Sequence, residues 1–162
     1  MNEIDFSQIY YFKGNECSKS ENYQKAIENY NKAIEINPNF SEAYYNRGFA
    51  YFHLENYQKA IENYDRAIEI NSNFASVFLN RGLAYSQLGD FQKEFSDYNQ
   101  AIEINPNFAE AYANRGNAYF KLGDIQKAFD DYNLAIKINS NLGRVYYNRG
   151  SAYFRIGEDR KA

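Results

Sequence analysis

Residues 41–74 read SEAYYNRGFAYFHLENYQKAIENYDRAIEINSNF, and related sequences precede and follow them. A glycine returns every 34 residues, at Gly14, Gly48, Gly82, Gly116 and Gly150. The same interval separates Tyr30, Tyr64, Tyr98 and Tyr132, and also Ala33, Ala67, Ala101 and Ala135. Several such series in one register indicate a repeat architecture.

Each repeat contains two amphipathic helices joined by a tight turn. Tyr44, Gly48 and Tyr51 lie at helical spacing in the first half, and Ala60 and Tyr64 continue that spacing in the second half. The small residues allow the two helix backbones to approach closely, while the rings fill the space beside them. Between the halves, glycine can end one helix in a left-handed turn and aspartate can cap the next. Such pairs stand at Gly89-Asp90 and Gly123-Asp124.

The turns between repeats carry a possible helix cap. Two of them read Asn-Pro-Asn-Phe, over residues 37–40 and 105–108. Asn39 stands three residues before Glu42, and Asn107 stands three before Glu110. This spacing predicts an asparagine version of the capping box, in which the side chain of the first residue caps the helix.

The order aromatic, glycine, aromatic, alanine, aromatic, alanine and proline at these spacings resembles the tetratricopeptide repeat. The resemblance extends from Ser7 to the last residue, with Pro38 and Pro106 closing two of the repeats. It implies an all-α fold, an α-solenoid of antiparallel helical hairpins that forms a right-handed superhelix. We therefore expect a single array over residues 1–162, with repeats over about 7–40, 41–74, 75–108 and 109–142 and a partial repeat over 143–162.

The sequence departs from the repeat pattern at a few positions. Cys17 replaces the second aromatic residue, and Ser72 and Ser140 replace the closing proline. Glu94 replaces the first alanine of the second helix. We expect Cys17 to be a small buried apolar residue, and we expect the Glu94 carboxylate to reach solvent or a cationic partner.

The partial fifth repeat admits two interpretations. Residues 144–156 are either a terminal helix that shields the fourth hairpin or the start of a further hairpin in a longer array. Tyr146, Tyr153 and Phe154 keep the internal pattern, which favours the longer array. An exposed edge of this kind can drive self-association.

The resemblance implies that the first helices line a concave groove, so we look there for a binding site. Asparagine stands two residues before four of the repeat glycines, and a carboxamide can pair with the backbone of an extended peptide whatever its sequence. Apolar residues on the same face would hold peptide side chains. The alternative is that the asparagines bond only to neighbouring helices or solvent. The predicted peptide-binding residues are Asn46, Asn80, Asn114, Asn148, Tyr45, Phe49, Leu79, Leu83 and Tyr147.

An arginine stands directly before the same four glycines, at Arg47, Arg81, Arg115 and Arg149. These cations could contact phosphates or acidic peptides. A structural role is favoured, in which the side-chain stem covers the core and the guanidinium bonds the second helix. The residues suited to accept from them are Asn29, Asn63, Asp97 and Asp131.

A subset of the resembled family clamps a C-terminal carboxylate with basic and asparagine residues on three successive first helices. Asn15 and Asn46 match two members of that set. Tyr11 stands where the first lysine is needed, and Ser76 and Asn80 replace the final basic pair. Recognition of a chaperone tail is therefore disfavoured.

The rest of the composition indicates a binding role and no catalytic activity. His53 is the single histidine and Cys17 the single thiol, so we expect no enzyme activity, no metal and no cofactor. The net charge of −3 argues against nucleic acid as a partner. No signal peptide or long apolar stretch is evident, and the single cysteine fits a reducing compartment, so we predict a cytoplasmic protein without membrane insertion. The expected partner is a protein or peptide, and the alternative is a structural module that self-associates through its terminal half-repeat.

Overall fold

The computed structural model describes residues 5–159, and within that range the chain forms nine helices and no strand. The helices are α1 (Phe6–Lys19), α2 (Tyr23–Ile36), α3 (Ser41–His53), α4 (Tyr57–Ile70), α5 (Ala75–Leu88), α6 (Phe91–Ile104), α7 (Ala109–Leu122), α8 (Ile125–Ile138) and α9 (Gly143–Asp159). Odd-numbered helices are the first helices of the predicted repeats, and even-numbered helices are the second. The predicted all-α class is confirmed.

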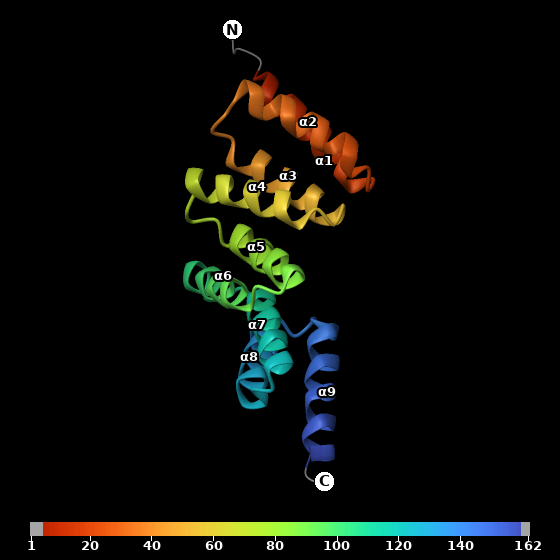
Figure 1. Cartoon of the computed structure of the whole chain (residues 1–162), viewed down its shortest axis with the longest axis vertical. Coiled ribbons are helices and arrows are strands. Elements are labelled where there is room, and N and C mark those ends of the chain that lie inside the picture. Colours follow the sequence, from red (N-terminus) through yellow and green to blue (C-terminus); the bar gives the residue numbers. More distant parts are fainter. Residues whose placement is uncertain (1–4, 160–162) are drawn as a thin grey trace. The chain divides into compact units, whose positions relative to one another are not determined.

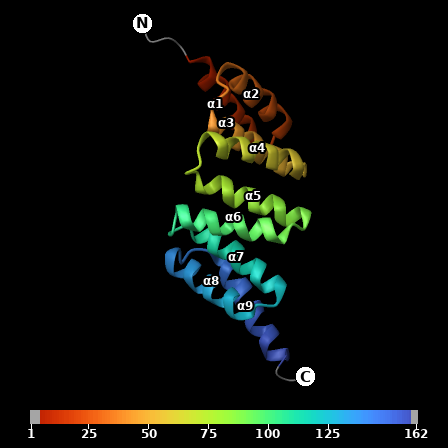
Figure 2. The ribbon, with the colours of Figure 1, turned by 60° about the vertical axis from the view of Figure 1, so that its left-hand side comes forward.

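The helices fall into two compact units, which divide after Asp90. In the first unit α1 packs on α2 and α3 on α4, while contacts of α2 with α3 and of α4 with α5 join successive hairpins (Figure 1). In the second unit α7 and α8 form a hairpin, with α6 against α7 and α9 against α8 (Figure 2). First helices also touch one another, α1 with α3, α3 with α5 and α7 with α9. Within each unit they therefore share a surface.

In the hairpins α1–α2, α3–α4 and α7–α8, a tyrosine of the second helix packs on the repeat glycine. Tyr64 is fully buried, and a Cβ added to Gly48 would lie 2.7 Å from the Tyr64 ring and 3.2 Å from the Ala60 carbonyl oxygen. A Cβ at Gly116 would lie 2.9 Å from the Tyr132 ring. The predicted close approach of the two helices is confirmed, because only glycine leaves room for these rings.

The turn inside each hairpin needs one residue in the left-handed region. Gly89 and Gly123 adopt φ of 76° and 83°, and Asp124 then accepts from the Lys127 backbone N–H, as the sequence predicts. In the first two hairpins the matching residues are Glu21 and Glu55, with φ of 57° and 58°. A side chain with a Cβ is disfavoured in this region, so these two turns are strained.

Replacing Glu55 with glycine should raise the free energy of unfolding by about 1 kcal/mol, because the turn keeps its shape without the Cβ clash. Urea denaturation followed by circular dichroism measures the change. The matched control is Gly123→Glu, which should lower stability by a similar amount. A change of the free energy of unfolding in the same direction for both variants would contradict this explanation of the turn.

The predicted asparagine capping box is wrong. The N-cap positions of α3 and α7 are Phe40 and Phe108, and neither helix has a side-chain cap. Asn37 instead accepts from the Asn39 backbone N–H at 3.1 Å, and the same bond recurs in the other inter-repeat turns. The asparagine before the proline therefore shapes the turn, and each first helix begins one residue later than a cap at Asn39 requires.

The expectation for Glu94 is also wrong. Its side chain is 2% exposed, and within residues 5–159 its Oε2 atom has no hydrogen-bond partner. Burial, the negative charge of Glu94 and a hydrogen bond with it raise the pKa of Tyr98. A carboxylate thus occupies a buried position that Ala26, Ala60 and Ala128 fill in the other repeats.

Candidate functional site

The four asparagines of the predicted series lie on α3, α5, α7 and α9, and all are half-buried. Three of them donate from Nδ2 to the preceding first helix. The bonds run from Asn46 to the Asn15 Oδ1 (2.9 Å) and the Tyr11 hydroxyl (3.2 Å), from Asn80 to the Tyr45 hydroxyl (2.8 Å) and from Asn148 to the Asn117 Oδ1 (2.7 Å). These bonds tie neighbouring first helices together, so three members of the series have a structural role.

Two further asparagines complete this network, and the sequence analysis did not assign them to the site. Asn15 Oδ1 accepts from the Tyr30 hydroxyl at 2.9 Å as well as from Asn46. Asn117 Oδ1 accepts from the Tyr132 hydroxyl at 2.9 Å and from the asparagine of the next first helix. The signal that could have found them is an asparagine directly after the repeat glycine.

The second repeat lacks this acceptor. Phe49 stands where Asn15 stands in the first repeat, and the buried Tyr64 hydroxyl has no hydrogen-bond partner in the described part of the chain. Burial raises the pKa of Tyr64, and it raises the pKa of Tyr132 only to about 12. Tyr30, Tyr64 and Tyr132 therefore have different polar environments although their positions in the repeat are the same.

Replacing Tyr132 with phenylalanine should lower the free energy of unfolding by about 1 kcal/mol, because its hydroxyl bond to Asn117 is lost. Tyr64→Phe is the matched control and should leave stability unchanged or raise it by about 1 kcal/mol, because it removes an unpaired buried hydroxyl. Thermal denaturation of the two variants measures this difference. Equal losses of stability in the two variants would show that the hydrogen bond of the Tyr132 hydroxyl does not stabilise the protein.

Asn114 differs from the other members of the series. No hydrogen bond is formed by its carboxamide within residues 5–159. In the sequence, the positions that hold acceptors for Asn46 are Leu79 and Leu83 one repeat before Asn114. Asn114 lines a pocket of about 140 Å³ with Asn117 and Asn148. Its amide is available to a ligand.

The first unit holds a second pocket, of about 420 Å³, on the shared surface of α1 and α3. Tyr45, Asn46 and Phe49 line it, so the structure brings three predicted site residues together. Phe12 of α1 joins them and was not predicted. The pocket therefore combines aromatic rings with a carboxamide.

The other predicted apolar residues lie in different environments. Leu79 is 8% exposed, so it belongs to the core and offers little surface to a ligand. Leu83 is half-buried on α5, and Tyr147 on α9 is 76% exposed. The predicted apolar residues therefore differ in how much surface they offer to a ligand.

The arginine series has the favoured structural role. Arg47 donates from Nε to Asn63 (2.6 Å) on its own second helix and from Nη1 to Asn31 (2.7 Å) on the previous one. Arg115 donates from Nε and Nη2 to Asp131, both at 2.8 Å, and from Nη1 to an asparagine of α6. Arg81 and Arg149 bond Asp65 and Asn133. Arg47 and Arg115 thus each join two second helices, and Arg81 and Arg149 each bond the second helix of the preceding repeat.

The residues considered for catalysis lie on different helices. His53 ends α3 and stacks on the Tyr23 ring at a centroid distance of 4.7 Å. Cys17 is half-buried rather than buried as expected, and it lines a pocket. Among the described residues no group of three or more histidine, cysteine, aspartate or glutamate side chains is placed to hold a metal ion. Over residues 5–159, no helix is long and apolar enough to cross a membrane.

Sequence comparison with protein families finds the same 34-residue unit. A TPR-repeat model matches residues 14–55, a tetratricopeptide-repeat model matches 41–74 and 109–142, and a further tetratricopeptide-repeat model matches 75–108. The matches together extend from residue 14 to residue 142. No protein with a curated description is matched by the chain.

Comparison with solved structures finds similar helical-repeat proteins. MamA is 25% identical with a TM-score of 0.81, over 94% of this chain and 84% of that chain. The first TPR of Spaghetti (RPAP3), solved with the HSP90 peptide SRMEEVD, is 25% identical with a TM-score of 0.69, over 72% and 93%. YrrB, described as a TPR protein with an unusual peptide-binding site, has a TM-score of 0.75 over 96% and 80%, and at 21% identity its likeness concerns the fold alone.

Proposed function

Because this chain belongs to the tetratricopeptide-repeat family, we propose that it is a protein-interaction module that binds an extended segment of a partner on its first helices. The observation that carries the proposal is the unpaired carboxamide of Asn114 at a pocket lined by two more asparagines. A carboxamide can donate to a peptide carbonyl and accept from a peptide N–H. A similar repeat protein was solved with a bound HSP90 peptide, which supports a peptide as the kind of ligand.

The pocket of the first unit supplies the apolar part of the proposed surface. Phe12, Tyr45 and Phe49 can hold an apolar side chain of the partner, while Asn46 lies beside them. The charged residues at this pocket, Glu16 and Lys19, already pair with each other at 2.7 Å. We therefore expect a partner that binds through backbone amides and apolar side chains rather than through charge.

Replacing Asn114 with alanine should weaken peptide binding by about three- to tenfold, the effect of one lost hydrogen bond, without lowering thermal stability. The probe is a fluorescent 12-residue peptide selected from a random library on the wild-type chain, with binding followed by fluorescence anisotropy. Asn107→Ala, on an exposed turn of the same unit, is the matched control and should bind as the wild type does. Equal affinity of the Asn114 variant, or a failure to select any peptide, would contradict the proposed surface.

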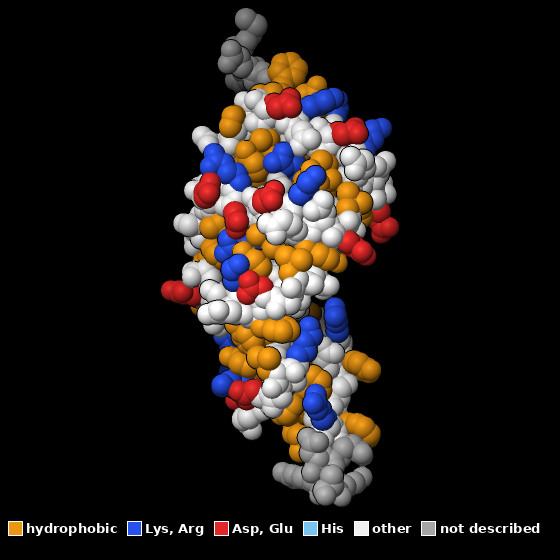
Figure 3. Space-filling model, in the orientation of Figure 1, with side chains coloured by type: hydrophobic (Ala, Val, Ile, Leu, Met, Phe, Trp, Pro, Cys, Tyr) orange, Lys and Arg blue, Asp and Glu red, His pale blue; other side chains and the backbone are white. Residues whose placement is uncertain are grey.

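A second candidate role is self-association through α9. Tyr147 and Phe154 are 76% and 72% exposed, and Figure 3 shows hydrophobic side chains standing out from this helix. Exposed apolar side chains that lie together favour contact between proteins. Light scattering that shows a concentration-dependent mass for the wild type, lost in the Tyr147→Lys, Phe154→Lys double variant, would favour this role over peptide binding.

The inferred role is binding rather than catalysis, as is general for scaffolds of this family. We propose a cytoplasmic location because Cys17 is a free thiol. No nucleic-acid role is proposed, since the net charge is −3 and the arginine series bonds the protein itself.

A further inference from the structure

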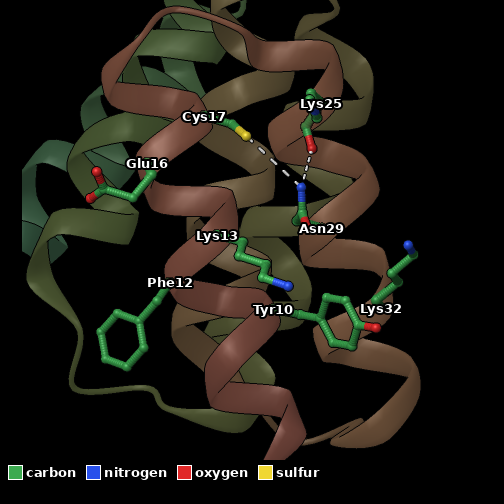
Figure 4. Close-up of a pocket in the computed structure, with 8 residues that line it drawn as sticks. All are labelled: Tyr10, Phe12, Lys13, Glu16, Cys17, Lys25, Asn29 and Lys32. Atoms are coloured by element: carbon green, nitrogen blue, oxygen red, sulfur yellow. Dashed lines mark hydrogen bonds between the residues drawn. The ribbon is translucent and has the colours of Figure 1, made fainter.

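The first hairpin has another pocket, which shares only Phe12 and Glu16 with the pocket that Tyr45, Asn46 and Phe49 line. It measures about 640 Å³ and lies along the groove between α1 and α2 (Figure 4). Cys17 of α1 and Asn29 of α2 face each other across the groove, and Lys13, Lys25 and Lys32 lie around it (Figure 4). None of these residues is used by the proposed function.

The pocket exists because the first repeat lacks a ring that other repeats carry. Cys17 stands 34 residues before Tyr51 and matches Tyr119 in the fourth repeat. The Lys59 ammonium lies 5.4 Å from the Tyr51 ring centroid, and the fourth repeat has the same contact at 5.3 Å. The first repeat keeps the matching lysine, Lys25, but not the ring. The counterparts of Lys25 cover a tyrosine ring in the second and fourth repeats. The Lys25 side chain therefore borders an open space in the first repeat.

A hydrogen-bond acceptor is also left open in this pocket. In the second repeat Asn63 Oδ1 accepts from Arg47 Nε at 2.6 Å. In the first repeat Lys13 replaces that arginine, and its ammonium lies 5.4 Å from the Tyr10 ring centroid instead. Asn29 Nδ2 donates to the Lys25 carbonyl oxygen at 2.8 Å and lies 3.9 Å from Cys17 Sγ. Its Oδ1 has no donor within residues 5–159.

The charge around the pocket is positive although the chain as a whole is acidic. Lys13, Lys25 and Lys32 form no ion pair with any described residue. The lining carboxylate, Glu16, is already paired with Lys19 at 2.7 Å. A ligand with negative charge is therefore favoured.

We propose that this pocket binds an aromatic side chain from an acidic segment of a partner protein. The ring takes the place that Tyr51 occupies in the second repeat and lies beneath the Lys25 ammonium. A tyrosine hydroxyl donates to Asn29 Oδ1, and carboxylates on either side of the aromatic residue pair with Lys13 and Lys32. The partner thus supplies the aromatic ring that the other repeats carry in their own sequence.

The test uses a fluorescein-labelled peptide, Gly-Glu-Asp-Tyr-Asp-Glu-Gly, with binding followed by fluorescence anisotropy. Cys17→Tyr fills the pocket with the residue of the other repeats and should weaken binding at least about tenfold, because the partner's ring loses its place. Cys17→Ala leaves the pocket open and should bind within about twofold of the wild type. Equal binding by the Cys17→Tyr variant, or no saturable binding by the wild type, would overturn the proposal.

A second measurement needs no variant of the pocket. Cys17 is the single cysteine of the chain, so mass spectrometry reports its alkylation by iodoacetamide without interference. The acidic tyrosine peptide should slow this reaction, whereas the same peptide with alanine for tyrosine should not. An unchanged rate at saturating peptide would refute the site. Asn114→Ala should bind the acidic peptide normally, which separates this site from the proposed peptide-binding surface.

Discussion

Replacing Arg115 with alanine should lower the free energy of unfolding by about 3 kcal/mol, the largest loss that we expect from a single substitution. Two guanidinium nitrogens of Arg115 bond Asp131 at 2.8 Å, and the Asp131 side chain is 7% exposed. The bond to Asp131 raises the pKa of Arg115, so the guanidinium stays charged. Without the arginine, the carboxylate stays buried and unpaired. Urea denaturation followed by circular dichroism measures the loss.

The chain offers its own control for this prediction. Asp131→Asn reproduces the Arg47–Asn63 pair of the second repeat, so it should cost about 1 kcal/mol or less. The double variant Arg115→Ala, Asp131→Asn should recover part of the loss seen in Arg115→Ala, because no buried charge is left without a partner. A double variant no more stable than Arg115→Ala would show that the buried carboxylate is not the cause.

Replacing Gly48 with alanine should lower the free energy of unfolding by about 2 kcal/mol, because the added methyl group overpacks the second hairpin. The new Cβ would lie 2.7 Å from the Tyr64 ring, and that ring is fully buried and cannot turn away. It would also lie 3.2 Å from the Ala60 carbonyl oxygen, so the helix backbones would have to separate. The midpoint of thermal denaturation reports the change.

Gly150 is the matched control, since it holds the same position in the last repeat. A Cβ added there has no neighbouring atom within 4 Å. Gly150→Ala should therefore raise stability by about 0.5–1 kcal/mol through helix propensity alone. Opposite signs for Gly48→Ala and Gly150→Ala would establish that the cost comes from the packed ring. A loss in both would point to the glycine backbone itself.

The binding residues were less predictable than the fold. The sequence places an asparagine at the same point of four repeats, which predicts four equivalent amides. In the structure Asn46 and Asn148 bond a preceding asparagine, Asn80 bonds Tyr45, and Asn114 has no bond in the described chain. The partner of each amide comes from a different first helix, 31 or 35 residues away, so the asparagine's own repeat does not reveal it.

Periodicity alone was sufficient for the hairpins. The spacing of Gly48, Ala60 and Tyr64 predicts two helices in close contact, because few backbone arrangements bury a tyrosine against a glycine. Gly123 likewise predicts a left-handed turn, and the structure has φ of 83° there. The sequence did not reveal that Glu55 adopts the same conformation, since a local turn can be imposed by the hairpin around it.

The sequence by itself determined the class of fold, the length of the repeat and the structural role of the arginines, because each depends on residues at a fixed spacing within about one repeat. Tertiary structure decided which amides are free, that Glu94 is buried, and that the replacement at Cys17 opens a pocket. These properties depend on what packs against a side chain from other helices. Burial and hydrogen bonding depend on the packing between helices, and the residue type alone does not specify them.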